Sequence, residues 1–89
     1  MEQDSKDLFL KAKELLEGEM TQISHKTWIE PLDINCIEGN IVTLVASDPF
    51  KKETVESRFL DLIKNTFDIL LQKDCEVKLL LKEDLLSNE

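Results

Sequence analysis

The sequence predicts one small α+β domain, in which a three-stranded sheet is backed by helices in the order α-α-β-β-α-β. Three observations predict it. Two stretches have apolar residues at helical spacing, a β-branched stretch contains a tight turn, and two proline-marked boundaries separate them. With 89 residues, the chain can build one modest core. Three strands cannot cover themselves, so the helices are expected to shield one sheet face and leave the other partly exposed.

The composition argues against a disordered protein, a membrane protein and a nonspecific nucleic-acid binder. Hydrophobic residues make up 42% of the chain, which is ordinary for a globular protein and too high for a disordered one. Apolar runs are too short for a membrane span, and the acidic N-terminus lacks the apolar core of a signal peptide. These features predict a cytoplasmic protein without a membrane partner. The net charge of −8 argues against tight, sequence-independent binding to a phosphate backbone.

The first helix is expected to start at a cap formed by Asp4 or Ser5 and to end at Gly18. Its apolar residues recur at helical spacing, at Leu8, Ala12, Leu15 and Leu16. Phe9 and Leu10 exceed what one apolar stripe needs. This surplus has two interpretations, a broad buried face or an exposed edge that contacts another molecule, and the pattern alone favours the first.

A shorter second helix is expected from Thr21 or Ser24 to Glu30, because Pro31 cannot continue it. Three of its side chains are expected to face inward, namely Ile23, Thr27 and Trp28. Trp28 is the only tryptophan in the chain. As a large apolar residue shortly before a proline, it is expected in the core.

The strands follow from alternation and from β-branched residues. Polar and apolar residues alternate over 32–36, which predicts a strand with one wet face. Gly39 supplies the backbone angle of a tight turn over residues 38–40. Residues 41–46 then predict the second strand of a hairpin. A third strand is expected over 76–81, with one face formed by Val77, Leu79 and Leu81.

The third helix is expected to begin at an Asp48 cap with Pro49 in its first turn, and to run to Gln72. Its apolar stripe consists of Phe50, Val55, Phe59, Leu62, Ile63, Phe67 and Leu70. A break or kink near residues 56–57 is the alternative to one continuous helix, although no glycine or proline marks it. After the third strand the chain is polar and expected to fray from Lys82 onward. The predicted domain therefore covers residues 1–82, and residues 83–89 form a tail that suits the start of a linker.

The sequence offers no catalytic centre. Cys36 and Cys75 belong to no Cys-x-x-Cys or Cys/His cluster, so reduced thiols are expected and a metal site is not. The single histidine, His25, is expected to be a solvated surface residue. Gly18 and Gly39 are too far apart for a phosphate-binding loop, which excludes a nucleotide hydrolase of that type. We therefore expect no cofactor and no enzyme activity, but a binding or interaction module.

Four segments carry a resemblance to a family. They are Leu8-Phe9 in the first helix, Trp28-Ile29 in the second, Ala46 to Phe50 at the turn, and Thr54 to Ile63 in the long helix. In order and separation they resemble the N-terminal domain (domain I) of the bacterial chromosomal replication initiator DnaA. The resemblance extends over residues 8–81, nearly the whole chain.

The resemblance implies a KH-like fold with the element order derived above, and a role in assembly rather than catalysis. It implies weak self-association into a homodimer or oligomer, recruitment of the replicative helicase, docking of initiation regulators and at most weak contact with single-stranded DNA. The chain would then be either one domain of a longer initiator or a stand-alone regulator that forms mixed assemblies with one.

The resemblance also assigns roles to residues. Leu8 and Phe9 match the self-association pair, with Phe9 in place of the usual tryptophan. A second set matches the surface that docks helicase and regulators: Ser24, Asp48, Phe50 and Lys51. Ser24 replaces an acidic residue of the family, Ser47-Asp48 replaces Pro-Asn, and Thr54 replaces a second tryptophan. From the residues alone, Leu8 and Phe9 could equally be core, and Phe50 could be a buried staple residue.

A KH-like binder of single-stranded nucleic acid is the alternative function. Its motivation is the implied fold and a cluster of cations at Lys51, Lys52 and Arg58. The net charge of −8 and the lack of a Gly-x-x-Gly loop oppose it. On the sequence alone, these cations are more simply a solvated helix face.

Overall fold

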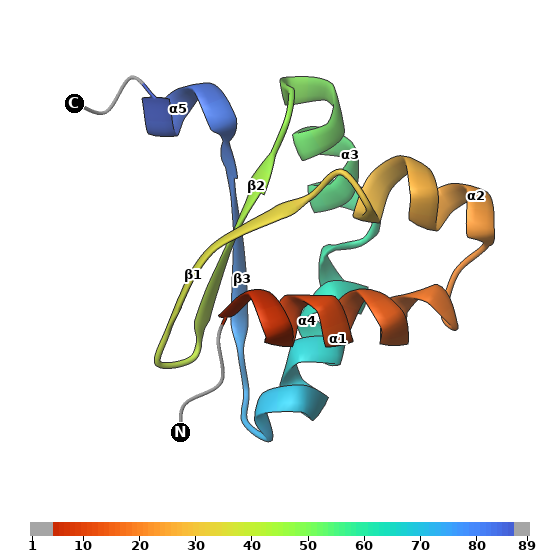
Figure 1. Cartoon of the computed structure of the whole chain (residues 1–89), viewed down its shortest axis with the longest axis vertical. Helices are drawn as coiled ribbons and strands as arrows, with labels where there is room; N and C mark the ends of the chain where they lie inside the picture. The colour runs from red at the N-terminus through yellow and green to blue at the C-terminus, as the bar shows by residue number, and fades with distance from the viewer. Residues whose placement is uncertain (1–4, 87–89) are drawn as a thin grey trace.

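The computed structural model describes residues 5–86, and Figure 1 shows their arrangement. The elements are α1 (Ser5–Glu17), α2 (Gln22–Ser24), the π-helix η1 (His25–Ile29), β1 (Asp33–Glu38), β2 (Ile41–Ala46), α3 (Pro49–Arg58), α4 (Leu60–Leu71), β3 (Glu76–Leu81) and α5 (Lys82–Leu86). The α+β class and the order of the main elements are confirmed. The expected cap at Asp4 lies outside the described residues.

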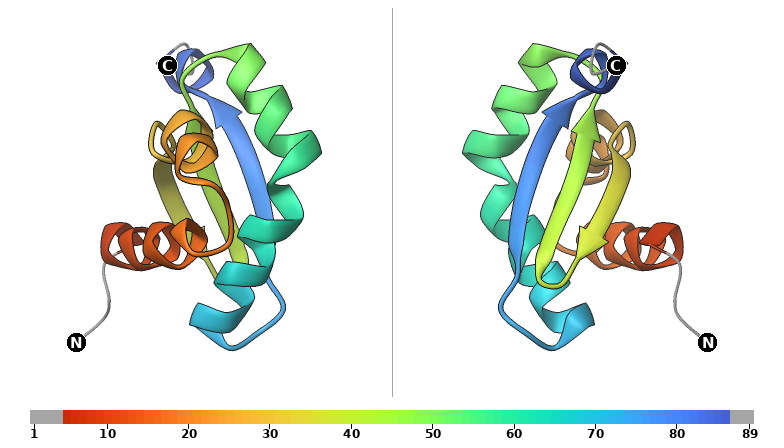
Figure 2. Two further views of the ribbon diagram at one scale, coloured as in Figure 1. Left: turned by 90° about the vertical axis from the view of Figure 1, so that its right-hand side faces the viewer. Right: turned by 90° about the vertical axis from the view of Figure 1, so that its left-hand side faces the viewer.

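The sheet has the order β1-β2-β3. β1 pairs antiparallel with β2 across the turn at Gly39, whose φ is positive, and a register shift lies between Ile34 and Cys36. β2 pairs with β3 in parallel, so α3 and α4 form the crossover between them. Figure 2 shows α1, α3 and α4 on one side of the sheet, with its other face uncovered by these helices. The expectation of a sheet with one partly exposed face is confirmed.

The core fills the space between the sheet and these helices. β2 contributes its inward residues Val42 and Leu44, and the helices contribute large apolar side chains that are fully buried: Leu16, Ile29, Val55, Ile63 and Phe67. The bounds of β2 and β3 agree with the predicted residues 41–46 and 76–81. In β3 the buried Val77 and Leu79 alternate with exposed residues, as the predicted face requires, and Leu81 is half-buried.

The helix predicted over residues 48–72 is two helices, and the break lies at Phe59, close to residues 56–57, where a break had been left open. α3 ends at Arg58 and α4 begins at Leu60, with Phe59 at φ −119° and ψ −2° between them. α3 packs on β2, β3 and η1, whereas α4 packs on α1 and β3. One straight helix could not face both sets of neighbours, and the bend at Phe59 lets Val55 and Ile63 both reach the core.

The second helix also differs from its prediction. The backbone N–H of Glu30 donates to the carbonyl oxygen of His25 over five residues, which makes a π turn. This wider turn rotates the faces, so His25 and Ile29 point inward while Ile23 is 80% exposed and Thr27 is exposed. The predictions of an inward Ile23 and Thr27 and of a solvated His25 were wrong.

His25 can be buried because its polar atoms have partners. It is only 5% exposed, and its Nε2–H donates to the carbonyl oxygen of Lys13 at 2.8 Å. Its Nδ1 lies 3.7 Å from a carboxylate oxygen of Glu30. His25 therefore ties α1 to η1, because a buried polar group with a hydrogen-bond partner avoids most of the cost of leaving water.

The chain after β3 does not fray at once. α5 runs over Lys82–Leu86 and packs beside the end of β3, so the predicted fraying from Lys82 was wrong for residues 82–86. Residues 87–89 of the predicted tail lie outside the described residues. Within residues 5–86, no helix is both long and apolar enough to cross a membrane.

Candidate functional site

The start of α3 presents an exposed aromatic residue. Asp48 caps the helix, since its carboxylate accepts a hydrogen bond from the backbone N–H of Lys51 at 2.8 Å, and Pro49 follows in the first turn. This confirms the predicted cap. The cap fixes the direction in which α3 leaves the sheet, and it leaves Phe50 68% exposed. Of the two interpretations of Phe50, the structure excludes the buried staple residue.

Trp28 forms the opposite wall. Its ring centroid lies 5.7 Å from that of Phe50, with the ring planes at 59°. This tilted arrangement is favourable for two aromatic rings. Trp28 is half-buried and packs against the core with its other side. The expectation that Trp28 is only a core residue was therefore incomplete, because it also shapes the surface next to Phe50.

The two rings border an open cleft of about 380 Å³ between η1 and α3, which we call the Trp28–Phe50 cleft. The cleft is lined by Trp28, Phe50, Glu53, Thr54, Ser57 and Arg58. Its hydroxyl groups are used within the helix. Thr54 donates to the carbonyl oxygen of Phe50 at 2.9 Å, and Ser57 donates to that of Glu53 at 2.8 Å. What remains for a partner is apolar surface and charged side chains.

The charged residues of α3 differ in their partners. Lys52 pairs with Glu56 at 3.2 Å, four residues further along the helix. Within residues 5–86, the side chains of Lys51 and Arg58 make neither a hydrogen bond nor an ion pair. Of the three cations predicted to form one patch, only Arg58 lines the cleft. Of the matched docking set, only Phe50 lines the cleft. Asp48 and Lys51 flank it at the start of α3, and Ser24 ends α2.

The sequence did not lead us to predict several of the residues that line this cleft. Glu53, Thr54 and Ser57 were not predicted as site residues, although their spacing from Phe50 carries a signal. Residues three, four, seven and eight positions apart share one side of a helix. Starting from an exposed Phe50, this spacing leads to the whole stripe that ends at Arg58.

The residues predicted for self-association lie elsewhere. Phe9 is 4% exposed, stacks on Phe67 with ring centroids 6.4 Å apart, and has the Lys13 ammonium 4.7 Å from its ring centre. Of the two interpretations given for Phe9, a buried face or an exposed edge, the structure shows the buried one. Leu8 is half-buried, and the exposed apolar residues of α1 are Leu10 and Leu15.

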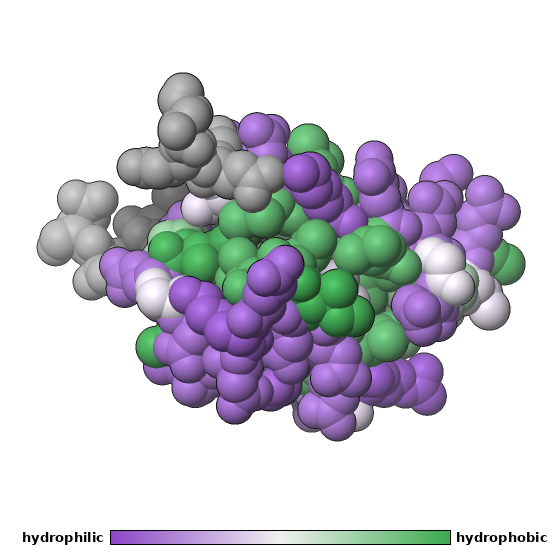
Figure 3. All heavy atoms as spheres, turned by 90° about the horizontal axis from the view of Figure 1, so that it is seen from below, coloured by the Kyte–Doolittle hydropathy of each residue, from purple (hydrophilic) through white to green (hydrophobic). Residues whose placement is uncertain are grey.

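A second apolar surface lies between α1 and α4. Leu15, Leu62 and Ile69 border a shallow groove of about 240 Å³ there. Figure 3 views this side of the molecule and shows a band of apolar surface between polar regions. The polar residues that line this groove are Glu19, Asn65 and Thr66, and none of them is a cation or an aromatic residue.

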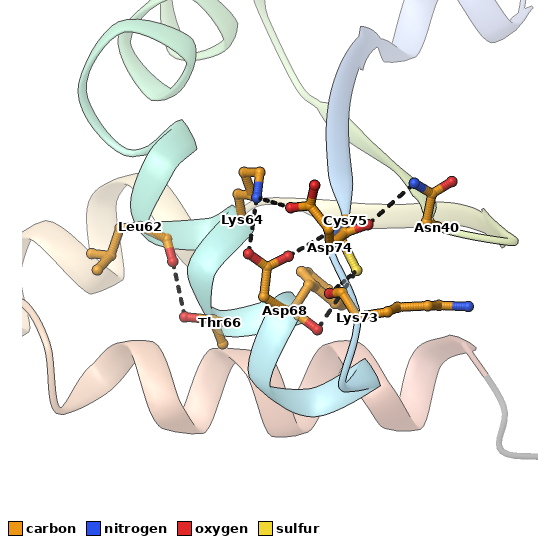
Figure 4. Close-up of polar contacts among 9 residues, drawn as sticks. Asn40, Leu62, Lys64, Thr66, Asp68, Lys73, Asp74 and Cys75 are labelled. Carbon is orange, nitrogen blue, oxygen red and sulfur yellow. Dashed lines mark hydrogen bonds and ion pairs between the residues drawn. The ribbon is translucent and has the colours of Figure 1, made fainter.

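Polar residues also gather where α4 meets β3, but they satisfy one another. Lys64 contacts Asp68 at 2.9 Å and Asp74 at 2.8 Å, as Figure 4 shows. Asp68 also accepts the backbone N–H of Cys75 at 2.7 Å. Hydrogen bonds from Lys64 and Cys75 hold the pKa of Asp68 below its usual value, and bonds to Asp74 and Asp68 raise the pKa of Lys64.

Neither a reactive nucleophile nor a metal site is found in this polar cluster at the α4–β3 junction of the described residues. Burial raises the pKa of the Cys75 thiol, which makes it a poor nucleophile. Cys36 and Cys75 are both free thiols. Among residues 5–86, no three histidine, cysteine or acidic side chains are placed to hold a metal ion. The cluster therefore serves the fold, and the Trp28–Phe50 cleft is the better candidate site.

Two comparisons bear on the identity of the chain. The sequence model of the family described as the DnaA N-terminal domain matches residues 6–68. Among solved structures, the chain is similar to one in a crystal structure of a HobA–DnaA (domain I–II) complex from Helicobacter pylori, with a TM-score of 0.71. The match has 14% sequence identity and covers 78% of this chain and 91% of that one. At that identity, the structural similarity shows a shared fold.

Proposed function

We propose, from the premise that this chain belongs to the DnaA N-terminal domain family, that the Trp28–Phe50 cleft is where it docks its protein partners. Family membership makes it a protein-interaction domain of the replication initiator type. The finer proposal is that the partners are the replicative helicase and regulators of initiation. The similar chain from Helicobacter pylori was crystallised in complex with HobA, a protein partner.

The exposure of Phe50 is the observation that carries this proposal. A phenylalanine that is 68% exposed contributes little to folding, because burial of its ring is what would stabilise the chain. Phe50 nevertheless lies on a fixed frame, with a helix cap beneath it and Trp28 beside it. Aromatic side chains held in this way are typical anchors of protein interfaces.

The test is to replace Phe50 and measure binding to the replicative helicase of the same organism by surface plasmon resonance. Phe50→Ala is expected to weaken binding by about 2 kcal/mol or more, as for an interface anchor. Ile69→Ala is the matched control, since Ile69 on α4 is an apolar residue of nearly equal exposure, at 70% against 68%. If Ile69→Ala weakened binding and Phe50→Ala did not, the docking surface would lie elsewhere.

We also propose weak self-association through α1. Since Phe9 is buried, the apolar contact surface would come from Leu8, Leu10 and Leu15. Each copy carries a charge of −8, so association should strengthen with added salt, which screens the repulsion. Sedimentation at rising protein concentration tests this. A strict monomer at high salt and high concentration would contradict it.

Weak contact with single-stranded DNA is the second candidate function. The observation in its favour is an exposed aromatic ring close to Lys51 and Arg58, whose side chains have no partner among residues 5–86. Bases stack on aromatic rings beside positive charge. Both functions would use the same cleft, so comparing a peptide with an oligonucleotide as the ligand separates them.

A further inference from the structure

Arg58 is the one cation that lines the Trp28–Phe50 cleft. It is exposed and, within residues 5–86, it has no hydrogen-bond or ion-pair partner. Other cations of the fold are engaged, such as Lys52 with Glu56 and Lys64 with two aspartates. The guanidinium group of an arginine is a planar fork of N–H donors that can bind a carboxylate. The aromatic rings beside it can bind an apolar group next to that carboxylate.

The charge distribution supports the same reading. With histidine neutral, η1 holds one cation, and α3 holds three cations against two anions. These two elements are the walls of the cleft and together carry +2, so the rest of the chain carries −10 against a total of −8. Every other helix and strand within residues 5–86 is neutral or negative. The flanking Glu30 and Asp48 offset this charge, and the lining itself holds one cation, Arg58, and one anion, Glu53. The cleft is therefore less acidic than the chain as a whole, and its positive charge lies at the Arg58 end.

Resting on the proposed docking function, we propose that the cleft recognises an acidic polypeptide segment. An apolar side chain of the partner packs against Trp28 and Phe50, and a carboxylate next to it pairs with Arg58. Lys51 adds positive potential from the same helix, whereas Glu53 is the one anion in the cleft lining. Glu53 lies one turn from Phe50, so it disfavours a second carboxylate at the aromatic end and sets the direction of the segment.

A polypeptide fits these groups better than a nucleic acid. A polynucleotide carries a negative charge on every nucleotide, and beyond the two walls it would meet a surface whose net charge is −10. Among the described residues, the cations of α3 that have no partner are Lys51 and Arg58, which are too few to follow a phosphate backbone. A peptide needs a single carboxylate at Arg58, and the remaining binding energy comes from the apolar contact.

The experiment uses the full 89-residue chain, labelled with ¹⁵N, and three short synthetic peptides. The peptides share one phenylalanine and differ only in its flanking residues, which are glutamate, glutamine or lysine. Binding is followed at the indole N–H of Trp28 and the side-chain Nε–H of Arg58. The glutamate peptide is expected to bind about tenfold more tightly than the glutamine peptide, the scale of one charge-assisted pair, and the lysine peptide more weakly than either.

Variants assign the preference to Arg58. Arg58→Gln is expected to abolish the advantage of the glutamate peptide over the glutamine peptide. Lys73→Gln removes the same charge from the exposed turn before β3 and is expected to keep the advantage. A preference that falls equally in both variants would reflect net charge and would overturn the role of Arg58.

The remaining outcomes separate this inference from the docking function. Equal binding of all three peptides, lost in Phe50→Ala, would overturn carboxylate recognition and leave docking intact. If no peptide bound and Phe50→Ala also left helicase binding unchanged, both proposals would fail. A short oligo-dT that bound more tightly than the glutamate peptide, and lost affinity in Arg58→Gln, would assign the cleft to single-stranded nucleic acid instead.

Discussion

Two aromatic pairs join helices in this protein, and their surroundings differ. Phe9 of α1 stacks on Phe67 of α4 inside the core, where both are buried. Trp28 of η1 meets Phe50 of α3 at the surface, where Phe50 is mostly exposed. The ring chemistry is nearly the same in both pairs. The first pair is covered because α1 and α4 pack closely, whereas α3 contributes only Val55 to the buried core.

The difference shows how a small domain can keep apolar surface outside its core. Most of the apolar stripe of α4 is used to close the core, so its residues are committed to folding. α3 is held by its Asp48 cap and one buried valine, and its other side chains stay at least partly exposed. An exposed aromatic ring can then be retained without cost to packing, which is expected where binding rather than stability maintains the residue.

The largest expected effect on the free energy of unfolding comes from truncating one ring of each pair and comparing the two variants. Phe9→Ala should lower the free energy of unfolding by about 3–5 kcal/mol, because it removes a buried ring and leaves a cavity. Phe50→Ala should lower it by less than about 1 kcal/mol, since it changes an exposed side chain. Urea unfolding followed by circular dichroism measures both.

If Phe9→Ala does not fold, Phe9→Leu keeps the comparison usable, with a smaller expected cost of about 1 kcal/mol. Equal losses for Phe9→Ala and Phe50→Ala would mean that the surface pair supports the fold as much as the buried pair does.

A smaller effect is expected at His25, which connects the two regions. His25→Ala removes a buried side chain and its hydrogen bond to the carbonyl oxygen of Lys13. The free energy of unfolding should fall by about 1–3 kcal/mol. The emission of Trp28 should shift to the red, because η1 loses its tie to α1 and the indole gains water.

The neighbouring variant Ser24→Ala is the control for His25→Ala, with an expected change of less than about 0.5 kcal/mol. An unchanged Trp28 spectrum in a destabilised His25→Ala protein would show that the tie does not position the cleft wall.

The smallest effect concerns the α4–β3 junction, whose polar groups satisfy one another. The pKa of Asp68 is lowered in the folded protein by its bonds to Lys64 and to the N–H of Cys75. A lowered folded-state pKa gives stability that is present above the unfolded value and lost as the pH falls through the folded one. The pKa of Lys64 is raised, so its contribution is fully present at neutral pH.

Asp68→Asn keeps an oxygen that can accept from Cys75 but removes the charge. The melting temperature of the native chain should therefore fall more steeply below about pH 4 than that of the variant. Asp61→Asn, at an exposed position of the same helix, should follow the native curve. Parallel curves for all three proteins would show that the Asp68 pairing adds nothing to stability.

Local patterns predicted much of this fold. The tight turn at Gly39, the second and third strands, and the cap at Asp48 each depend on residues close in sequence, and the structure confirms them. The π turn at His25 was missed, and the break left open at residues 56–57 lies at Phe59 instead, because neither position carries a local mark. Both arise where a helix packs against two different neighbours. The spacing of apolar residues within a short segment does not indicate which distant elements pack against it.

The candidate site divides in the same way. The sequence by itself determined that Phe50 follows a helix cap and that α3 carries cations, since both are statements about neighbouring residues. Only the tertiary structure decided that Phe9 is covered and Phe50 is not. Whether an aromatic ring is buried depends on which distant helix packs across it. α4 packs across Phe9, whereas Trp28 borders Phe50 and leaves it open.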